Sequence, residues 1–176
     1  MAKPVLTISS KNYGAWALRG WLMAKLAGLD FTEKVIPPDD PAMKAEMLLL
    51  APSMLVPSLQ HGSVKVWDTL AIGEYLNEIK PKAGLLPADA KARAHCRAIC
   101  GEMHSGFSAL RGALPMNIKA HFPGFKVWSR AQADIDRVLE AAEQIVAREA
   151  AMAKAILSGT PISQVMGGHY EHMLKN

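Results

Sequence analysis

The stretch Val56–Leu76, VPSLQHGSVKVWDTLAIGEYL, decides the fold. Val56–Leu59 and Val64–Trp67 are short apolar runs typical of strands, and the turn between them, Gln60–Ser63, contains a glycine. From Leu70 to Ile79 apolar residues recur at helical spacing, which predicts an amphipathic helix. The stretch therefore predicts a β-hairpin that leads directly into a helix.

The residues before this stretch predict a strand–helix–strand unit. Pro4–Ile8 and Phe31–Ile36 have the composition of strands, and the segment from Trp16 to about Leu29 has mostly helical spacing. A further short helix, Ala42–Leu50, is stopped by Pro52. The element order is β-α-β-α-β-β-α, which predicts an α/β layer with a mixed sheet.

The residues after the stretch are predicted to be helical. A linker at 81–87 contains a glycine and two prolines, and long helices are expected from Ala88 to about Leu114 and from Phe125 to about Leu157. We therefore predict a first domain at 1–80 and an all-helical second domain at 88–176. The fold class is α/β plus all-α.

Composition and charge exclude several classes of function. The chain has 176 residues, 50% of them hydrophobic, and a formal net charge of +4 without a basic stripe, so no nucleic-acid partner is expected. No apolar run is long enough to span a membrane. Cys96 and Cys100 are the two cysteines and lack zinc-site spacing, so no metal site is expected. Two reduced thiols suit a cytoplasmic protein.

Two features of the opening stretch raise a question of ligand binding. A cis bond at Val56–Pro57 would direct the backbone of Val56 away from the sheet edge, where it could pair with an extended peptide. Asp68 and Thr69 stand directly before the predicted helix, where either side chain can act as a helix cap. The same pair could instead hold a ligand carboxylate and amine at the positive end of the helix.

The strand, the Val-Pro pair, the hairpin and the acid–hydroxyl pair together resemble the thioredoxin-like N-terminal domain of glutathione transferases. The matching residues are Val56, Pro57, Asp68, Thr69, Ala71 and Ile72. The resemblance implies a cis proline, pairing of Val56 with the cysteinyl backbone of glutathione, and binding of the γ-glutamyl end by Asp68 and Thr69. It also implies that glutathione is the co-substrate, that the second substrate is a small electrophile, and that the chain forms a homodimer.

The loop SSKNYGAW, between the first strand and the first helix, resembles that of serine-type, zeta-related bacterial transferases, with Trp16 and Arg19 matching a Trp-x-x-Arg pattern. The family places its thiolate donor in this loop. An ungapped match puts the family's catalytic serine on Asn12, which departs from the pattern. Tyr13 and Ser10 are alternative donors. These residues could also simply build a turn.

The second domain departs from the family after about residue 140, because the tail lacks the capped central helix that the resemblance implies. A divergent short transferase, a truncated or fused gene, and a dimer partner that covers the exposed surface remain three explanations. A non-catalytic module that binds glutathione or another protein is therefore the alternative function. His104 and Arg111, on the first predicted long helix, either face the cleft between the domains or lie on the surface.

Overall fold

The structure, a computed structural model, describes residues 3–36 and 55–158. The chain divides into two compact units, residues 1–126 and 127–176. The predicted short helix Ala42–Leu50 and the tail that begins at Gly159 lie outside the described residues.

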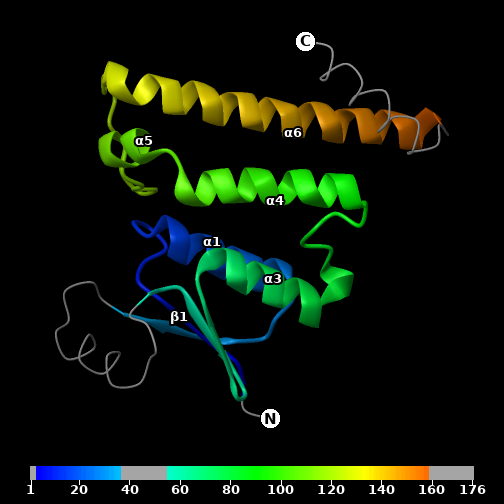
Figure 1. The fold of residues 1–176 in the computed structure, drawn as a ribbon. Coiled ribbons are helices and arrows are strands. Elements are labelled where there is room, and N and C mark those ends of the chain that lie inside the picture. Colours follow the sequence, from blue (N-terminus) through cyan, green and yellow to red (C-terminus); the bar gives the residue numbers. More distant parts are fainter. Residues whose placement is uncertain (1–2, 37–54, 159–176) are drawn as a thin grey trace. The chain divides into compact units, whose positions relative to one another are not determined.

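The first unit contains a four-stranded sheet (Figure 1). Its strands are β1 (Val5–Ile8), β2 (Thr32–Val35), β3 (Ser58–His61) and β4 (Val64–Trp67). The spatial order is β2-β1-β3-β4, with β1 parallel to β2 and antiparallel to β3, and with β3 antiparallel to β4. The predicted mixed sheet is confirmed.

The first strand of the hairpin lies two residues further along the chain than predicted, and the turn is two residues shorter. Strand β3 begins at Ser58, not Val56, and continues to His61, so the turn consists of Gly62 and Ser63. Gly62 has φ +60°, a value that a glycine adopts without a steric penalty. The predicted four-residue turn was therefore too long, because the glycine allows a two-residue connection.

Helices α1 (Ala15–Leu26) and α3 (Thr69–Ile79) lie side by side on one face of the sheet (Figure 1). The alternation of β1 directs Leu6 and Ile8 into the core beneath them, where both are fully buried. The largest other core side chains are Leu59, Ile72 and Leu76. This core fixes the starts of both helices at the same end of the sheet.

The rest of the first unit is a 3₁₀ turn, η1 (Pro81–Ala83), and helices α4 (Ala90–Ser105) and α5 (Ser108–Ala113). The prediction of one helix from 88 to 114 was wrong. Gly106 leaves the helical conformation, and Phe107 has φ +66°, so the chain turns between α4 and α5. A Cβ on Gly106 would lie 2.7 Å from the carbonyl oxygen of Glu102, which only glycine avoids here. The domain boundary at 81–87 stays a prediction.

The second unit begins with the 3₁₀ turn η2 (Ser129–Ala131) and continues as helix α6 (Gln132–Ser158). The helix therefore begins at Gln132, later than its predicted start at Phe125. Leu139, Ile145 and Val146 on α6 are exposed. Within the described residues, no helix has both the length and the apolar character that crossing a membrane requires.

Candidate functional site

Pro57 lies fully buried where strand β3 begins, and the Val56–Pro57 peptide bond is cis. The ring of Pro57 packs directly against Gly20 in the middle of α1. A Cβ on Gly20 would lie 2.8 Å from Cγ and 2.9 Å from Cβ of Pro57. The absence of a side chain at residue 20 therefore sets how closely α1 approaches the start of β3.

Val56 lies two residues before Ser58, which forms the first ladder pair of the hairpin with Trp67. Across the part of the chain that the structure describes, the backbone N–H and C=O of Val56 have no hydrogen-bond partner. Because Asp68 follows Trp67 directly, Val56 and the start of α3 stand at the same end of the hairpin. The free backbone groups at this end are the kind that pair with an extended peptide.

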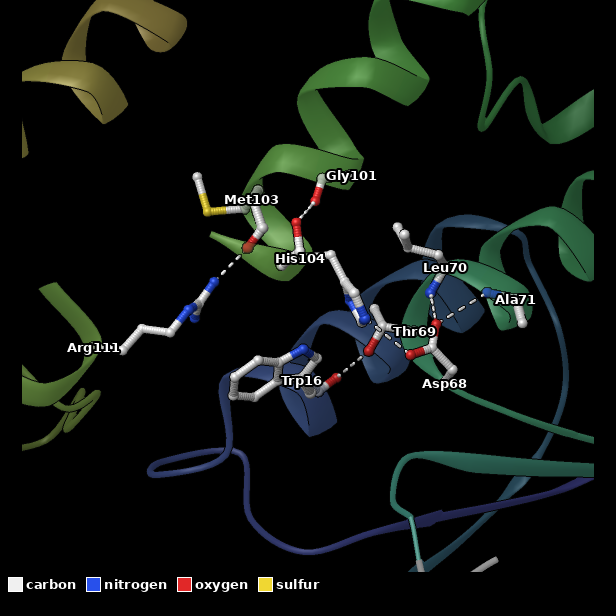
Figure 2. Close-up of polar contacts among 10 residues, drawn as sticks. Trp16, Asp68, Thr69, Leu70, Ala71, Gly101, Met103, His104 and Arg111 are labelled. Carbon is white, nitrogen blue, oxygen red and sulfur yellow. Dashed lines mark hydrogen bonds and ion pairs between the residues drawn. The ribbon is translucent and has the colours of Figure 1, made fainter. Parts of the chain in front are cut away.

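Asp68 is the N-cap of α3 and has φ +76°. Its Oδ1 accepts hydrogen bonds from the backbone N–H groups of Leu70, at 2.8 Å, and Ala71, at 3.4 Å (Figure 2). Its Oδ2 lies 3.0 Å from Nε2 of His104 on α4. One carboxylate therefore caps α3 and connects it to α4, so the capping interpretation of Asp68 is confirmed.

Thr69 is only 3% exposed, and its Oγ1 donates a hydrogen bond to the backbone oxygen of Trp16 at 3.3 Å (Figure 2). The side chain thus joins the first turns of α1 and α3. The hydroxyl faces the protein rather than open solvent. The backbone N–H of Thr69 is the first of α3, and such N–H groups have no partner within their own helix.

Ser10 organises the loop between β1 and α1. Its Oγ accepts hydrogen bonds from the backbone N–H groups of Asn12, at 3.1 Å, and Tyr13, at 3.2 Å. The backbone oxygen of Ser10 accepts from the N–H of Gly14 at 3.1 Å. These bonds fit the turn-building role that the sequence left open for Ser10.

Asn12 connects this loop to a segment more than one hundred residues further along the chain. Its Nδ2 donates to Oδ1 of Asn117 at 3.0 Å, and its Oδ1 accepts from the backbone N–H of Lys119 at 3.0 Å. The backbone oxygen of Asn12 also accepts from the N–H of Ile118 at 3.4 Å. Both polar atoms of its side chain therefore have protein partners. The side chain of Tyr13, in contrast, is 67% exposed.

Helix α1 begins at Ala15 without a side-chain cap, because its N-cap residue is Gly14. The backbone N–H groups of the first turn thus leave a partial positive charge at this end of the helix. Trp16 stands in this turn, and its backbone is bonded to Thr69. The first turn of α1 and the start of α3 therefore lie next to each other.

Two arginines and a histidine surround the indole of Trp16. The guanidinium carbon of Arg111 lies 4.6 Å from the ring centroid, that of Arg19 lies 5.5 Å away, and the ring of His104 meets the indole edge-on at 6.4 Å. Figure 2 shows Trp16 between Arg111 on one side and His104 with Asp68 on the other. Burial, followed by the charge of Arg111, lowers the pKa of Arg19.

The two thiols of α4 are both free, and burial raises the pKa of Cys100. A raised pKa disfavours the reactive thiolate form. Among the described residues, no group of three or more His, Cys, Asp or Glu side chains could hold a metal ion.

The structure gathers Val56, Asp68 and Thr69 at one end of the sheet, near the loop that carries Ser10, Asn12 and Tyr13. Sequence reasoning missed the contacts of Asn117 and Lys119 with Asn12, for which no local pattern gives a signal. Arg19 and Arg111 were noted individually, but nothing in their spacing, 92 positions apart, predicts that both contact Trp16.

Comparison with known proteins gives consistent results. The family model described as the N-terminal domain of glutathione S-transferase matches residues 13–79. A probable maleylacetoacetate isomerase from Caenorhabditis elegans is 32% identical over 108 residues, which are 61% of this chain and 50% of that protein. Glutathione S-transferase 1 from Dianthus caryophyllus is 40% identical over 81 residues, which are 46% of this chain and 36% of that protein.

A solved structure of a glutathione transferase homologue from Burkholderia GL BGR1, with bound glutathione, is 30% identical with a TM-score of 0.51. The match covers 64% of this chain and 59% of that one. The chain spans about half the length of the curated maleylacetoacetate isomerase that it matches. Residues 13–79 of this chain are therefore similar to the N-terminal domain of glutathione S-transferases.

Proposed function

We propose that the first unit binds glutathione at the end of the sheet where Val56, Asp68 and Thr69 meet. It then activates the thiol for attack on, or isomerisation of, a small electrophile. The observation that carries this proposal is the free backbone of Val56 at the same end of the hairpin as the start of α3. The glutathione bound to the Burkholderia homologue supports it.

Each part of glutathione has a partner of matching chemistry. The backbone of Val56 pairs with the cysteinyl unit, as one strand pairs with another. The γ-glutamyl carboxylate accepts from the backbone N–H of Thr69 at the positive end of α3. Asp68 faces the γ-glutamyl ammonium group, although its two oxygens already accept from α3 and contact His104.

The thiolate is stabilised at the uncapped start of α1. An ordinary thiol has a pKa of about 8.5, so only a few per cent is ionised at pH 7. The first-turn N–H groups of α1 and the positive charges of Arg19 and Arg111 favour the anion. Among the loop candidates, Tyr13 is the donor we favour, because its side chain is exposed. The Asn12 amide already donates to Asn117, and the Ser10 hydroxyl accepts two hydrogen bonds within the loop.

The hydrogen bonds of the same loop favour a second function, the binding of glutathione without activation of its thiol. If no side chain of the loop reaches the sulfur, the domain binds glutathione without activating it. The commitment of the Asn12 amide to Asn117 and Lys119 favours this binding module. The two functions differ in one measurable quantity, the pKa of the bound thiol.

The test is calorimetric binding of glutathione, with the thiolate absorbance near 240 nm followed across pH, on wild type and on Asp68→Asn. The asparagine keeps an oxygen that can cap α3 but removes the negative charge. Asp89→Asn is the matched control, since Asp89 caps α4 by accepting from the N–H of Ala92 at 2.8 Å. It therefore changes a capping aspartate elsewhere in the same unit.

Binding that weakens about tenfold in Asp68→Asn and not in Asp89→Asn would support the site, because a charge-assisted contact contributes about 1.5–3 kcal/mol. A bound thiol with a lowered pKa would support the enzyme. An unshifted thiol would establish the binding module instead. Absence of binding at millimolar glutathione would reject the site.

A homodimer and a cytoplasmic location are further parts of this proposal. They rest on the family resemblance and on the two free thiols at Cys96 and Cys100. Sedimentation of the purified chain tests the first, and fractionation of the cells that make it tests the second.

A further inference from the structure

The two cysteines of α4 lie on the same side of the helix. Cys96 and Cys100 are four residues apart, and residues at this spacing are neighbours on a helix surface. Their side chains are hydrogen-bonded to each other, and both thiols are free. Cys100 is exposed and Cys96 is half-buried, so a small molecule can reach the pair from solvent. The pair therefore presents two adjacent sulfurs on one helix.

The helix holds the two cysteines too far apart for a disulfide. The Cβ atoms of residues four apart on a helix are separated by about 5–6 Å. A disulfide requires a Cβ–Cβ distance of about 3.5–4.5 Å. Both residues lie inside α4, so a direct bond between the sulfurs would distort the helix. A single atom inserted between the two sulfurs lengthens the bridge and removes this conflict.

The number of available donors decides which inserted atom suits the pair. A structural zinc ion takes four protein ligands. Among the described residues, no group of three or more His, Cys, Asp or Glu side chains could supply them. A monosubstituted trivalent arsenical carries one organic group of its own and needs only two sulfurs. Its pyramidal arsenic holds both sulfurs on one side, whereas a mercuric ion prefers them on opposite sides.

The protonation of the pair favours the same choice. Partial burial, followed by the neighbouring thiol of Cys96, raises the pKa of Cys100. A metal cation binds thiolates, so it must displace a proton that this thiol holds more tightly than usual. A trivalent arsenic hydroxide removes the thiol proton in the reaction itself, because that proton leaves with the hydroxide as water.

The charges around the pair suit an uncharged product. Arg19 on α1 and Glu74 on α3 both lie close enough to Cys100 to act on its charge, and they do so in opposite directions. Glu74 is itself bound to Arg97 by two hydrogen bonds, at 2.7 and 2.8 Å. An arsenical held by two sulfurs is electrically neutral, so it needs no further counter-charge at this position.

We propose that Cys96 and Cys100 form a dithiol site for monosubstituted trivalent arsenicals. Two As–O bonds of the arsenical break and two As–S bonds form, one to each Sγ. The two thiol protons leave on oxygen as water. Arsenic stays trivalent and neither sulfur is oxidised, so the step needs no oxidant or reductant. The site lies on α4 and does not depend on the proposed function.

The test is a titration of the full, reduced chain with phenylarsine oxide, in which intact mass spectrometry follows the equimolar adduct. The adduct is then challenged with a monothiol, mercaptoethanol, and with a dithiol, ethanedithiol. We expect wild type to retain the arsenical against the monothiol and to release it to the dithiol. Cys96→Ser and Cys100→Ser should each bind about 100-fold more weakly, because the second sulfur no longer acts within the same molecule.

The matched control combines Cys96→Ser with Ala98→Cys. Ala98 is exposed in α4 and lies two residues from Cys100, so this variant keeps two thiols but places them on different faces of the helix. It should bind phenylarsine oxide as weakly as Cys96→Ser alone. Far-UV circular dichroism of each variant shows that its helices are retained.

Equal affinity of wild type and Cys96→Ser for phenylarsine oxide would overturn the dithiol site. Tight binding by the control variant would also overturn it, because the number of thiols rather than their spacing would then govern binding. Formation of a cadmium complex by wild type, without an arsenical adduct, would show that the pair selects a metal cation instead.

Discussion

Asp68 and His104 are in contact through Oδ2 and Nε2 at 3.0 Å, although Asp68 caps α3 and His104 belongs to α4. The other oxygen of the same carboxylate accepts from the N–H of Leu70 at 2.8 Å. The acid proposed to meet the ligand amine is thus held by the protein on both oxygens. This arrangement pre-organises the side chain and also makes it part of the stability of α3.

Replacing Asp68 should separate these two roles. Asp68→Ala is expected to lower the free energy of unfolding by about 1–2 kcal/mol, since the cap is lost. Asp68→Asn should lose less, because its amide oxygen can still accept from Leu70 and asparagine tolerates a positive φ. Urea denaturation measures both values. Equal losses in the two variants would show that charge, not capping, governs stability here.

Replacing a crowded glycine and an open glycine with alanine should have opposite effects on stability. Gly20→Ala introduces a methyl group within 2.9 Å of the proline ring and should destabilise the protein by about 1–3 kcal/mol. Gly101→Ala, in α4, meets no atom within 4 Å and should stabilise it by about 0.5–1 kcal/mol. Thermal unfolding of both variants tests this, and a neutral Gly20→Ala would contradict the close packing.

The bonds between Asn12 and the 117–119 segment predict a change in local dynamics. Asn12→Ala removes the acceptor for the N–H of Lys119, so hydrogen exchange at that amide should accelerate about fivefold, given a net hydrogen bond of about 1 kcal/mol. Asn117→Ala is the comparison, because it leaves that acceptor in place and removes only the side-chain bond. It should accelerate exchange at Lys119 less. Similar rates in both variants would argue against the role of the Asn12 oxygen.

The ion pair between Glu74 on α3 and Arg97 on α4 predicts a dependence of stability on pH. Two hydrogen bonds from Arg97, at 2.7 and 2.8 Å, lower the pKa of Glu74 below its ordinary value of 4.5. The stabilisation is therefore present above that value and is lost as the pH falls through the lowered pKa. Wild type should be more stable than Glu74→Gln at pH 7, and the difference should vanish at low pH.

Stability curves of the two proteins from pH 7 to pH 2 measure this difference. Both side chains are partly exposed, so the effect should be small and should weaken in salt. A difference that grows on acidification would contradict the assigned direction of the Glu74 pKa.

Local patterns predicted much of the fold. The alternation of β1, the helical spacing in α3 and the cap at Asp68 depend on residues within about four positions of one another. The wrong prediction of a single helix across Gly106 has the same origin, because the apolar spacing continues through this position. The helix nevertheless ends there, and the next residue, Phe107, has a positive φ. Glycine inside an apolar pattern signals a turn only weakly.

The sequence by itself determined the order of the elements, the hairpin and the acid–hydroxyl pair at the start of α3, because these depend on neighbouring residues. Only the tertiary structure decided that Asn12 bonds to Asn117 and Lys119 and that Arg19 and Arg111 share Trp16. Apart from the contact of Arg19 with Trp16 in the same helix, these contacts join residues about one hundred positions apart. Such distances are closed by the packing of α1 and α3 on a common core and of α4 against α3, and no short-range pattern encodes them.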